Sequence, residues 1–180
     1  MAEKGLVQIY TGSGKGKTTI ALGLALRGAG WGKKVIIYQF LKPPALKLGE
    51  RKAVSKMKLA IKIVPVETEW DMRKSLNDKK SIESTKKKIG QICDKIAAEA
   101  KKKKYDIIIL DEIVFCLSKK LADINWIKSI IKSKSKSVEI VLTGRGATNE
   151  LIKMADLVTE MKIVKHPFKK GVKARKGIEF

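Results

Sequence analysis

The chain has 180 residues, a length that suits one domain with a sizeable core, and its composition of 44% hydrophobic and 32% charged residues excludes a disordered protein. No apolar run reaches the roughly 18 residues of a membrane span, and no secretory signal pattern opens the chain. The net charge of +22 points first to nucleic acid, but only five of the 40 basic residues are arginine, which phosphate and base recognition favours. We therefore expect a lysine-rich surface that attracts anions such as ATP, without a specific nucleic-acid or membrane partner.

Strand-like and helical segments alternate along the chain, which predicts an α/β fold with a mostly parallel central sheet and helices on both faces. The expected strands cover residues 6–10, 34–40, 59–66, 105–112, 138–144 and 157–164. The expected helices cover 17–27, 77–103, 123–132 and 148–155, while 41–58 suits a loop or a short helix. No linker or repeat divides the chain, so residues 1–180 are expected to form a single domain.

The segment TGSGKGKTT, residues 11–19, follows the first strand and opens the first helix. It is close to the phosphate-binding pattern G-x-x-x-x-G-K-[ST], but Thr11 stands where the first glycine belongs. Glycines let backbone N–H groups surround phosphate oxygens, and the helix N-terminus adds positive potential. Lys17 is expected to neutralise phosphate charge and Thr18 to offer its hydroxyl to Mg²⁺. The candidate nucleotide-binding residues are Gly12, Ser13, Gly14, Lys15, Gly16, Lys17, Thr18 and Thr19.

Asp111 and Glu112 follow the apolar run 107–110, at the carboxyl end of the clearest strand in the chain. Parallel sheets bind ligands at this edge, so the two acids should lie beside the phosphate loop. Together with Thr18 they are the candidate ligands of Mg²⁺, and Lys17, Thr18 and Glu112 are the candidate catalytic residues. The spacing alone does not decide which of the two acids contacts the metal directly.

Three further features carry weaker predictions. TGRG at 143–146 ends another strand at the same edge, and its Thr143 and Arg145 either face the nucleotide or belong to a simple turn before the next helix. His166 has no ligand-spaced neighbours and is predicted to be structural, before a turn at Pro167 and Phe168 that packs an aromatic ring. The two cysteines are isolated in the sequence and are expected to be buried, reduced thiols of a cytoplasmic protein: Cys93 and Cys116.

Four segments in this order resemble the P-loop type of ATP:corrinoid adenosyltransferase, also called cob(I)alamin adenosyltransferase. They are TGSGKGKTT, VIIYQFLK with GER at 49–51, IILDE, and TGRG followed by the tail VKHPFKKGVKARKGIEF. The loop by itself is generic, whereas the glycine arrangement and the tail are characteristic of this family. The resemblance implies a P-loop NTPase (RecA-like) fold.

The resemblance also implies an activity, in adenosylcobalamin biosynthesis or salvage. The 5′-deoxyadenosyl group of ATP moves to the cobalt of a reduced Co(I) corrinoid, and triphosphate leaves. Cobalt(I) is itself a strong nucleophile, which agrees with the lack of a nucleophile–base pattern in the sequence. The implied cofactor is Mg²⁺, ATP and a corrinoid are the substrates, and an electron donor such as a reduced flavoprotein and a second copy of the chain are the implied partners.

The sequence departs from the family where the corrinoid is expected to bind. Family members carry a phenylalanine and a tryptophan two residues apart after the third strand; here Thr68 replaces the phenylalanine and Trp70 is retained as the candidate corrin-facing residue. The chain also begins almost directly at the first strand, without the extra N-terminal helix of some members. Two alternatives stay open: a RecA-like ATPase or kinase that would use Glu112 and Arg145, and a basic nucleic-acid-binding P-loop protein.

Overall fold

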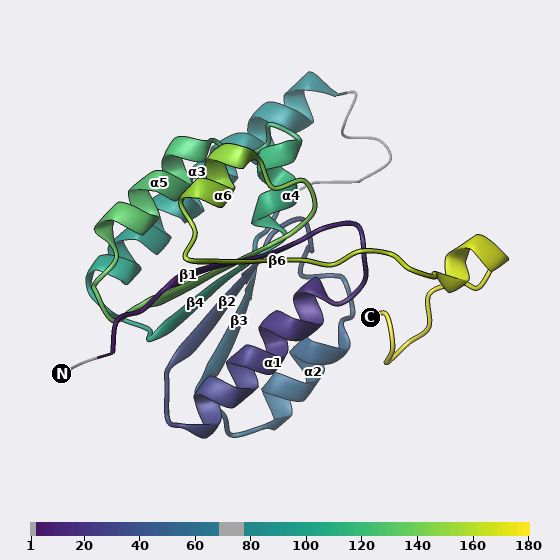
Figure 1. The fold of residues 1–180 in the computed structure, drawn as a ribbon, viewed down its shortest axis with the longest axis horizontal. Helices are drawn as coiled ribbons and strands as arrows, with labels where there is room; N and C mark the ends of the chain where they lie inside the picture. Colours follow the sequence, from purple (N-terminus) through teal and green to yellow (C-terminus); the bar gives the residue numbers. More distant parts are fainter. Residues whose placement is uncertain (1–2, 69–77) are drawn as a thin grey trace.

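The computed structural model of the protein describes residues 3–68 and 78–180. Its centre is a six-stranded sheet with the order β3-β2-β4-β5-β1-β6, in which every neighbouring pair is parallel (Figure 1). The strands are β1 (Val7–Thr11), β2 (Val35–Gln39), β3 (Ile61–Pro65), β4 (Ile107–Asp111), β5 (Glu139–Thr143) and β6 (Leu157–Glu160). This arrangement confirms the predicted α/β class and agrees with a P-loop NTPase-like fold.

Helices cover both faces of the sheet, with α1 and α2 on one side and α3 to α6 on the other (Figure 1). Their bounds are α1 (Lys17–Gly30), α2 (Gly49–Lys56), α3 (Lys79–Lys101), α4 (Ile113–Ser118), α5 (Ile124–Ser133) and α6 (Asn149–Lys153). A short 3₁₀ helix, η2 (Pro167–Lys170), lies in the C-terminal segment. Asp78 caps α3, because its side chain accepts hydrogen bonds from the backbone N–H groups of Lys80 and Ser81.

The central strands β2 and β4 are buried at every residue, and they are apolar along most of their length because both of their faces are covered. In β2, Ile36 and Tyr38 belong to the cluster that packs under α3 and α5, while Val35 and Ile37 belong to the cluster under α1. The strand period of two thus sends neighbouring side chains into two separate cores. This is why no alternation of apolar and polar residues marks these strands in the sequence.

The register of the sheet brings the carboxyl ends of the central strands to one edge. Gln39 at the end of β2 lies opposite Asp111 at the end of β4, and Thr143 at the end of β5 lies opposite Tyr10 of β1. The segments that follow β1, β2 and β5 at this edge therefore lie close enough to contact Asp111 through Thr18, Lys42 and Thr143.

Several boundaries differ from the sequence prediction. The first helix continues to Gly30, since the glycines at 28 and 30 are tolerated in its last turns. The last strand ends at Glu160, four residues early. The helix α4 was not predicted, because its six residues IVFCLS are almost all apolar and extend the apolar run of β4 without a helical period.

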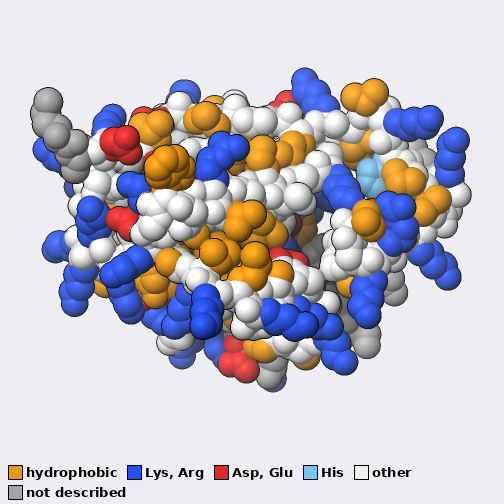
Figure 2. All heavy atoms as spheres, turned by 90° about the horizontal axis from the view of Figure 1, so that it is seen from below, with side chains coloured by type: hydrophobic (Ala, Val, Ile, Leu, Met, Phe, Trp, Pro, Cys, Tyr) orange, Lys and Arg blue, Asp and Glu red, His pale blue; other side chains and the backbone are white. Residues whose placement is uncertain are grey.

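Positively charged side chains are spread over the protein surface. Figure 2 shows Lys and Arg side chains scattered around the outline of one face, with hydrophobic side chains gathered towards its centre. A shallow apolar groove between α1 and α2, which includes Leu22, Leu26, Val54 and Met57, adds to the exposed hydrophobic area. Among the described residues, no helix is both long and apolar enough to cross a membrane.

Candidate functional site

The phosphate loop, residues 11–19, is held in a narrow turn against the segment that follows β6. Gly12 has a φ of 98°, a left-handed conformation that favours glycine. A Cβ atom on Gly12 would lie 2.4 Å from the backbone oxygen of Met161, and one on Gly14 would lie 2.8 Å from the same atom. The Gly14 N–H donates to that oxygen at 2.7 Å. Glycine is thus required at 12 and 14 by close backbone approach.

Thr11, which replaces the first glycine of the usual pattern, is not in a position that requires glycine. It is the last residue of β1, it pairs with Glu160, and it is almost fully buried. Its Oγ1 accepts a hydrogen bond from the Ala147 N–H at 3.3 Å. The side chain therefore joins the loop to the segment after β5.

Lys17 is the first residue of α1, and its ammonium group lies under the loop. Its Nζ donates to the backbone oxygens of Gly12 at 2.9 Å and Gly14 at 2.6 Å. Burial lowers the pKa of Lys17, and the nearby Glu112 acts against that shift. The partly desolvated ammonium group of Lys17 thus lies beside the N-terminus of α1. Both the ammonium group and the helix N-terminus favour binding of an anion such as phosphate.

Asp111 is hydrogen-bonded to two other segments at this edge, the phosphate loop and the end of β5. Its Oδ1 accepts hydrogen bonds from Thr18 Oγ1 at 2.8 Å and from Thr143 Oγ1 at 2.7 Å. The Thr143 hydroxyl in turn accepts from the Glu112 N–H at 3.0 Å. The predicted proximity of Thr18 and Asp111, 93 residues apart in the sequence, is therefore confirmed. Thr143, the other candidate for facing the nucleotide, uses its hydroxyl to hold the two acids from β5.

Glu112 turns away from the strand. Its φ of 69° is left-handed, an unfavourable conformation for a residue with a side chain, and it directs the carboxylate toward the pocket as α4 begins. Desolvation raises the pKa of Glu112, and the negative charge of Asp111 adds to the rise. The two acids therefore have different surroundings: Asp111 is hydrogen-bonded and buried, and Glu112 faces the hollow.

A pocket of about 330 Å³ lies over the loop and collects the predicted residues. Its lining consists of Ser13, Gly14, Lys15, Gly16, Lys17, Thr18, Thr19, Lys42, Glu112, Arg145, His166, Ile178 and Glu179. Arg145 thus reaches the same pocket as the phosphate loop, which favours the nucleotide-facing alternative over a simple turn. Four lining residues were not predicted to take part in the site: Lys42, His166, Ile178 and Glu179.

The C-terminal segment supplies three of these additional residues by folding back along the loop (Figure 1). Glu179 Oε1 forms an ion pair with Lys15 Nζ at 3.0 Å and also contacts Arg175. His166 Nδ1 accepts a hydrogen bond from the Phe168 N–H at 3.2 Å, which fits the predicted structural role, and its ring also lines the pocket. Phe168 lies in the predicted turn, and its ring is edge-on to that of His166 with 6.5 Å between the centroids, but the side chain is 74% exposed and is not part of the core.

Two predictions concern residues away from the pocket. Cys93 and Cys116 are buried and free, as expected, and burial raises the pKa of the Cys93 thiol to about 12. Trp70 lies outside the described residues. Thr68, which stands in place of the family's phenylalanine, is buried after β3, and its hydroxyl has no hydrogen-bond partner in the part of the chain that the structure describes.

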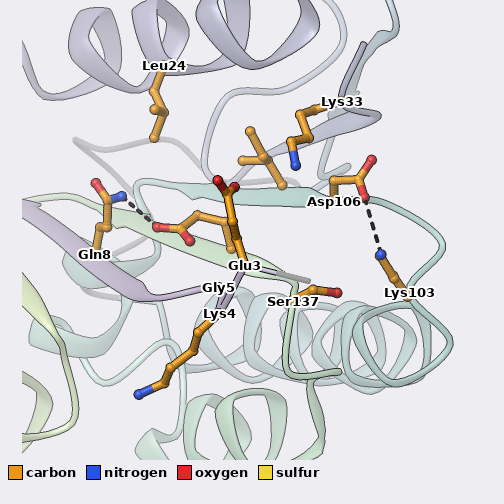
Figure 3. A pocket seen from close by; sticks show the side chains of 11 residues that line it. Glu3, Lys4, Gly5, Gln8, Leu24, Lys33, Lys103, Asp106 and Ser137 are labelled. Atoms are coloured by element: carbon orange, nitrogen blue, oxygen red, sulfur yellow. Dashed lines mark hydrogen bonds and ion pairs between the residues drawn. The ribbon is translucent and has the colours of Figure 1, made fainter. Parts of the chain in front are cut away.

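A second hollow, of about 400 Å³, lies at the opposite edge of the sheet, where the strands begin (Figure 3). Its central acids, Glu139 and Asp106, are already paired with the protein. Glu139 accepts from the Leu6 N–H and the Gln8 side chain, and Asp106 accepts from the Lys34 N–H. These contacts close the amino ends of the strands, so the pocket at the carboxyl edge is the candidate site.

The oxygen groups of the site suit a hard divalent cation. Among the described residues, no group of three or more His, Cys, Asp or Glu side chains gathers to bind a metal. The available donors are the Asp111 carboxylate and the Thr18 hydroxyl, with Glu112 close by. Mg²⁺ is commonly held by one or two carboxylates together with substrate phosphates and water, and this donor set fits that pattern.

The chain is similar over almost its whole length to a family of known proteins. Residues 3–180 match the family model described as ATP:corrinoid adenosyltransferase BtuR/CobO/CobP. The chain is 29% identical over 178 residues to the corrinoid adenosyltransferase of Escherichia coli strain K12, covering 99% of this chain and 87% of the relative. It is 32% identical over 182 residues to that of a Sinorhizobium species (99% and 81%) and 31% identical over 180 residues to that of Pseudomonas aeruginosa (99% and 85%).

Proposed function

The chain belongs to the ATP:corrinoid adenosyltransferase family, and we propose that it transfers the 5′-deoxyadenosyl group of ATP to the cobalt of a reduced corrinoid. The cobalt(I) centre of the substrate attacks C5′ of the ribose, the C5′–O5′ bond breaks, and its electron pair leaves with triphosphate. The product is an adenosylated corrinoid, which fits a role in adenosylcobalamin biosynthesis or salvage.

The observation that carries the proposal is the joining of the phosphate loop to Asp111 through the 2.8 Å hydrogen bond of Thr18. This arrangement would suit a metal-bound triphosphate, which is the leaving group of the proposed reaction. The surroundings offer no activated protein nucleophile among the described residues. Ser13 and His166 line one hollow, but the Nδ1 atom of His166 accepts a backbone hydrogen bond and no bond joins the two side chains. The nucleophile is therefore supplied by the second substrate.

Each predicted residue then has a role in the site. Lys17, Lys15 and the backbone N–H groups of residues 12–19 stabilise the charge that grows on the triphosphate. Thr18 and Asp111 would hold Mg²⁺, which would supply further charge neutralisation. Glu112 binds water around the metal, and Arg145 contacts the nucleotide from the end of β5.

Thr11 bears on which end of ATP is presented. In an ATPase the γ-phosphate must face an attacking water, whereas here C5′ must face cobalt at near-attack distance. We attribute the change to the start of the loop, where Thr11 continues β1 and bonds the Ala147 N–H. A nucleotide-bound structure with the γ-phosphate in line with water would contradict this assignment.

The corrinoid is proposed to contact Trp70. Reduction of cobalt is easier when its lower axial ligand is replaced by apolar side chains, and Trp70 is the retained member of the family's aromatic pair. Visible spectroscopy of cob(II)alamin with protein and MgATP tests this role. We expect an absorption feature of four-coordinate cobalt(II), lost in Trp70→Ala and kept in the control Trp31→Ala, whose native side chain is exposed at the end of α1. An unchanged spectrum with the native protein would refute the assignment.

The activity is tested with reduced cobalamin, ATP and Mg²⁺ under anaerobic conditions. We expect light-sensitive adenosylcobalamin and triphosphate in equal amounts. Lys17→Met should lower kcat by at least ~100-fold, since it removes a charge beside the leaving group, while Lys52→Met, on the exposed face of α2, should not. Formation of ADP and phosphate alone would support an ATPase or kinase, and salt-sensitive DNA or RNA binding without adenosyl transfer would support a nucleic-acid-binding protein.

We also propose a homodimer, an electron donor such as a reduced flavoprotein, and a cytoplasmic location with Cys93 and Cys116 reduced. The net charge of +22 would attract an acidic donor. Light scattering of the purified protein tests the dimer, and electron transfer from a reduced flavoprotein at low and high salt tests the donor.

A further inference from the structure

Lys42 lies in the segment between β2 and α2, and its ammonium group ends in the middle of the site. Its Nζ is 2.6 Å from Asp111 Oδ2 and 3.3 Å from Thr18 Oγ1. The Asp111 side chain is 1% exposed and that of Lys42 is 20% exposed. This is therefore a largely buried ion pair, unlike the surface lysines that give the chain its net charge.

The segment that carries Lys42 is fixed by Arg51, near the start of α2. The Arg51 guanidinium donates to the backbone oxygens of Lys42 at 2.6 Å and Pro43 at 2.9 Å. It also donates to the buried Gln39 side chain at 2.7 Å and to the Leu46 oxygen at 3.1 Å. One side chain thus ties the end of β2, the following segment and α2 together.

The backbone just before Lys42 is turned toward the site. Leu41 has a φ of 55°, which is unfavourable for a residue with a side chain and persists only where the surroundings hold it. The preceding Phe40 N–H donates to the Asp111 backbone oxygen at 3.0 Å, which holds this segment against β4. The sheet register, the Leu41 turn and the Arg51 contacts therefore all direct Lys42 to Asp111.

Lys42 contacts the same two oxygen-bearing groups that are assigned to Mg²⁺. An ammonium group and a divalent cation cannot both hold Asp111 Oδ2 and Thr18 Oγ1 at contact distance. We propose that Lys42 competes with the metal for Asp111 and, once the metal has bound, contacts the triphosphate. This inference rests on the proposed function, and it makes metal binding depend on the nucleotide, because the displaced ammonium gains a new anionic partner only when triphosphate is present.

Metal binding without nucleotide gives the first test. Mn²⁺ replaces Mg²⁺, and the loss of the free Mn²⁺ signal in electron paramagnetic resonance gives the affinity. Lys42→Met should bind Mn²⁺ about tenfold more tightly than the native protein, because Asp111 no longer has a competing cation. The control Lys47→Met removes an equal charge from an exposed position on the same segment and should leave the affinity unchanged.

Binding of tripolyphosphate in saturating Mg²⁺ gives the second test, by calorimetry. Lys42→Met should bind it about tenfold more weakly, Lys42→Arg should retain most of the affinity, and Lys47→Met should match the native protein. Arg51→Met should shift both affinities in the same directions as Lys42→Met, but less, because Arg51 acts by positioning. If Lys42→Met does not fold, Lys42→Gln keeps a donor to Asp111 and removes the charge.

The two affinities must therefore move in opposite directions. A structural role of Lys42 would weaken both, and any result other than tighter Mn²⁺ and weaker tripolyphosphate binding overturns the proposal. Neither measurement uses the corrinoid. A native protein that forms no adenosylcobalamin would refute the proposed function, while unchanged affinities in Lys42→Met would refute only the role of Lys42.

Discussion

At Gly12 the backbone of the phosphate loop has a left-handed conformation and passes so close to Met161 that a side chain has no room. Thr11, one residue earlier, is an ordinary strand residue with a hydrogen-bonded hydroxyl. The requirement for glycine in the usual pattern has thus moved along the chain by one position. Glycine is needed at this position because the backbone of Met161 leaves no room for a side chain, and not only because the loop binds phosphates.

Substitution of Gly12 should show this difference. We expect Gly12→Ala to lower the free energy of unfolding by about 2–3 kcal/mol and to abolish ATP binding, because it combines backbone strain with a backbone clash. Gly23→Ala on the exposed face of α1 is the control. Its Cβ meets no atom within 4 Å, so we expect a gain of about 0.5–1 kcal/mol. Urea unfolding and calorimetric ATP titration measure both; equal effects of the two substitutions would contradict the interpretation.

Thr143 should matter through the acids that it braces. Thr143→Val removes the donor to Asp111 Oδ1 and the acceptor for the Glu112 N–H, leaving buried polar groups without partners. We expect a loss of about 3 kcal/mol of stability. Thr143→Ser keeps the hydroxyl and should cost about 1 kcal/mol for the lost methyl group. Thermal unfolding gives the ranking, and similar losses in the two variants would show that the hydroxyl is unimportant.

The sequence indicated the loop residues and Asp111, because strand, glycines and acids follow one another in a recognisable order. It did not indicate Lys42 or Glu179. Lys42 is one of many lysines with no distinguishing spacing, and its place depends on the Leu41 turn and the Arg51 contacts. Glu179 depends on the path of the whole C-terminal segment. Contacts made by loops carry no periodic pattern, so three-dimensional structure is needed to find them.

At the scale of elements, the strands and long helices were predictable, since each is a long apolar run or has a clear helical period. The short helix α4 was not, because Glu112 adopts a left-handed turn between two apolar segments that read as one. The order β3-β2-β4-β5-β1-β6 was not predicted either. Local pattern identifies an element but says little about which neighbour it pairs with.

The C-terminal segment is the element whose attachment depends on pH. Hydrogen bonds from Arg175, and then from Lys15, lower the pKa of Glu179 from 4.5 to about 2. A lowered pKa in the folded state stabilises the attachment above pH 4.5, and this contribution is lost as the pH falls toward 2. We expect the protection factors of residues 175–180, which correct the hydrogen-exchange rates for the intrinsic effect of pH, to fall over this range.

Glu179→Gln separates this effect from general acid unfolding. The variant should show a loosely attached segment already at pH 7, with little further change at lower pH. Glu83→Gln, an exposed position on α3, should behave like the native protein. Native-like protection of residues 175–180 in Glu179→Gln would show that the ion pairs do not hold the segment.

At the scale of the whole molecule, the net charge of +22 should govern how fast ATP arrives. The field of many lysines raises the local concentration of a polyanion, and salt screens it. We expect the association rate of a fluorescent ATP analogue to fall about tenfold between 0.02 and 0.5 M salt in stopped-flow measurements. Adenosine, which carries no charge, provides the control; equal salt dependence for both ligands would exclude electrostatic steering.

The position of β1 in the sheet has a consequence for how the chain folds. β1 pairs with β5 and β6, through contacts such as Val7 with Ile140 and Gln8 with Leu157, so both of its partners come from the distant part of the sequence. Such long-range pairings close large loops and slow folding. The phosphate loop directly follows β1, so its native conformation depends on the pairing of β1. We therefore expect the loop to reach this conformation late in folding, after β2 and β3 have been able to pair. The N-terminal strand and the phosphate loop, which are synthesised first, are therefore expected to be among the last elements to form their native contacts.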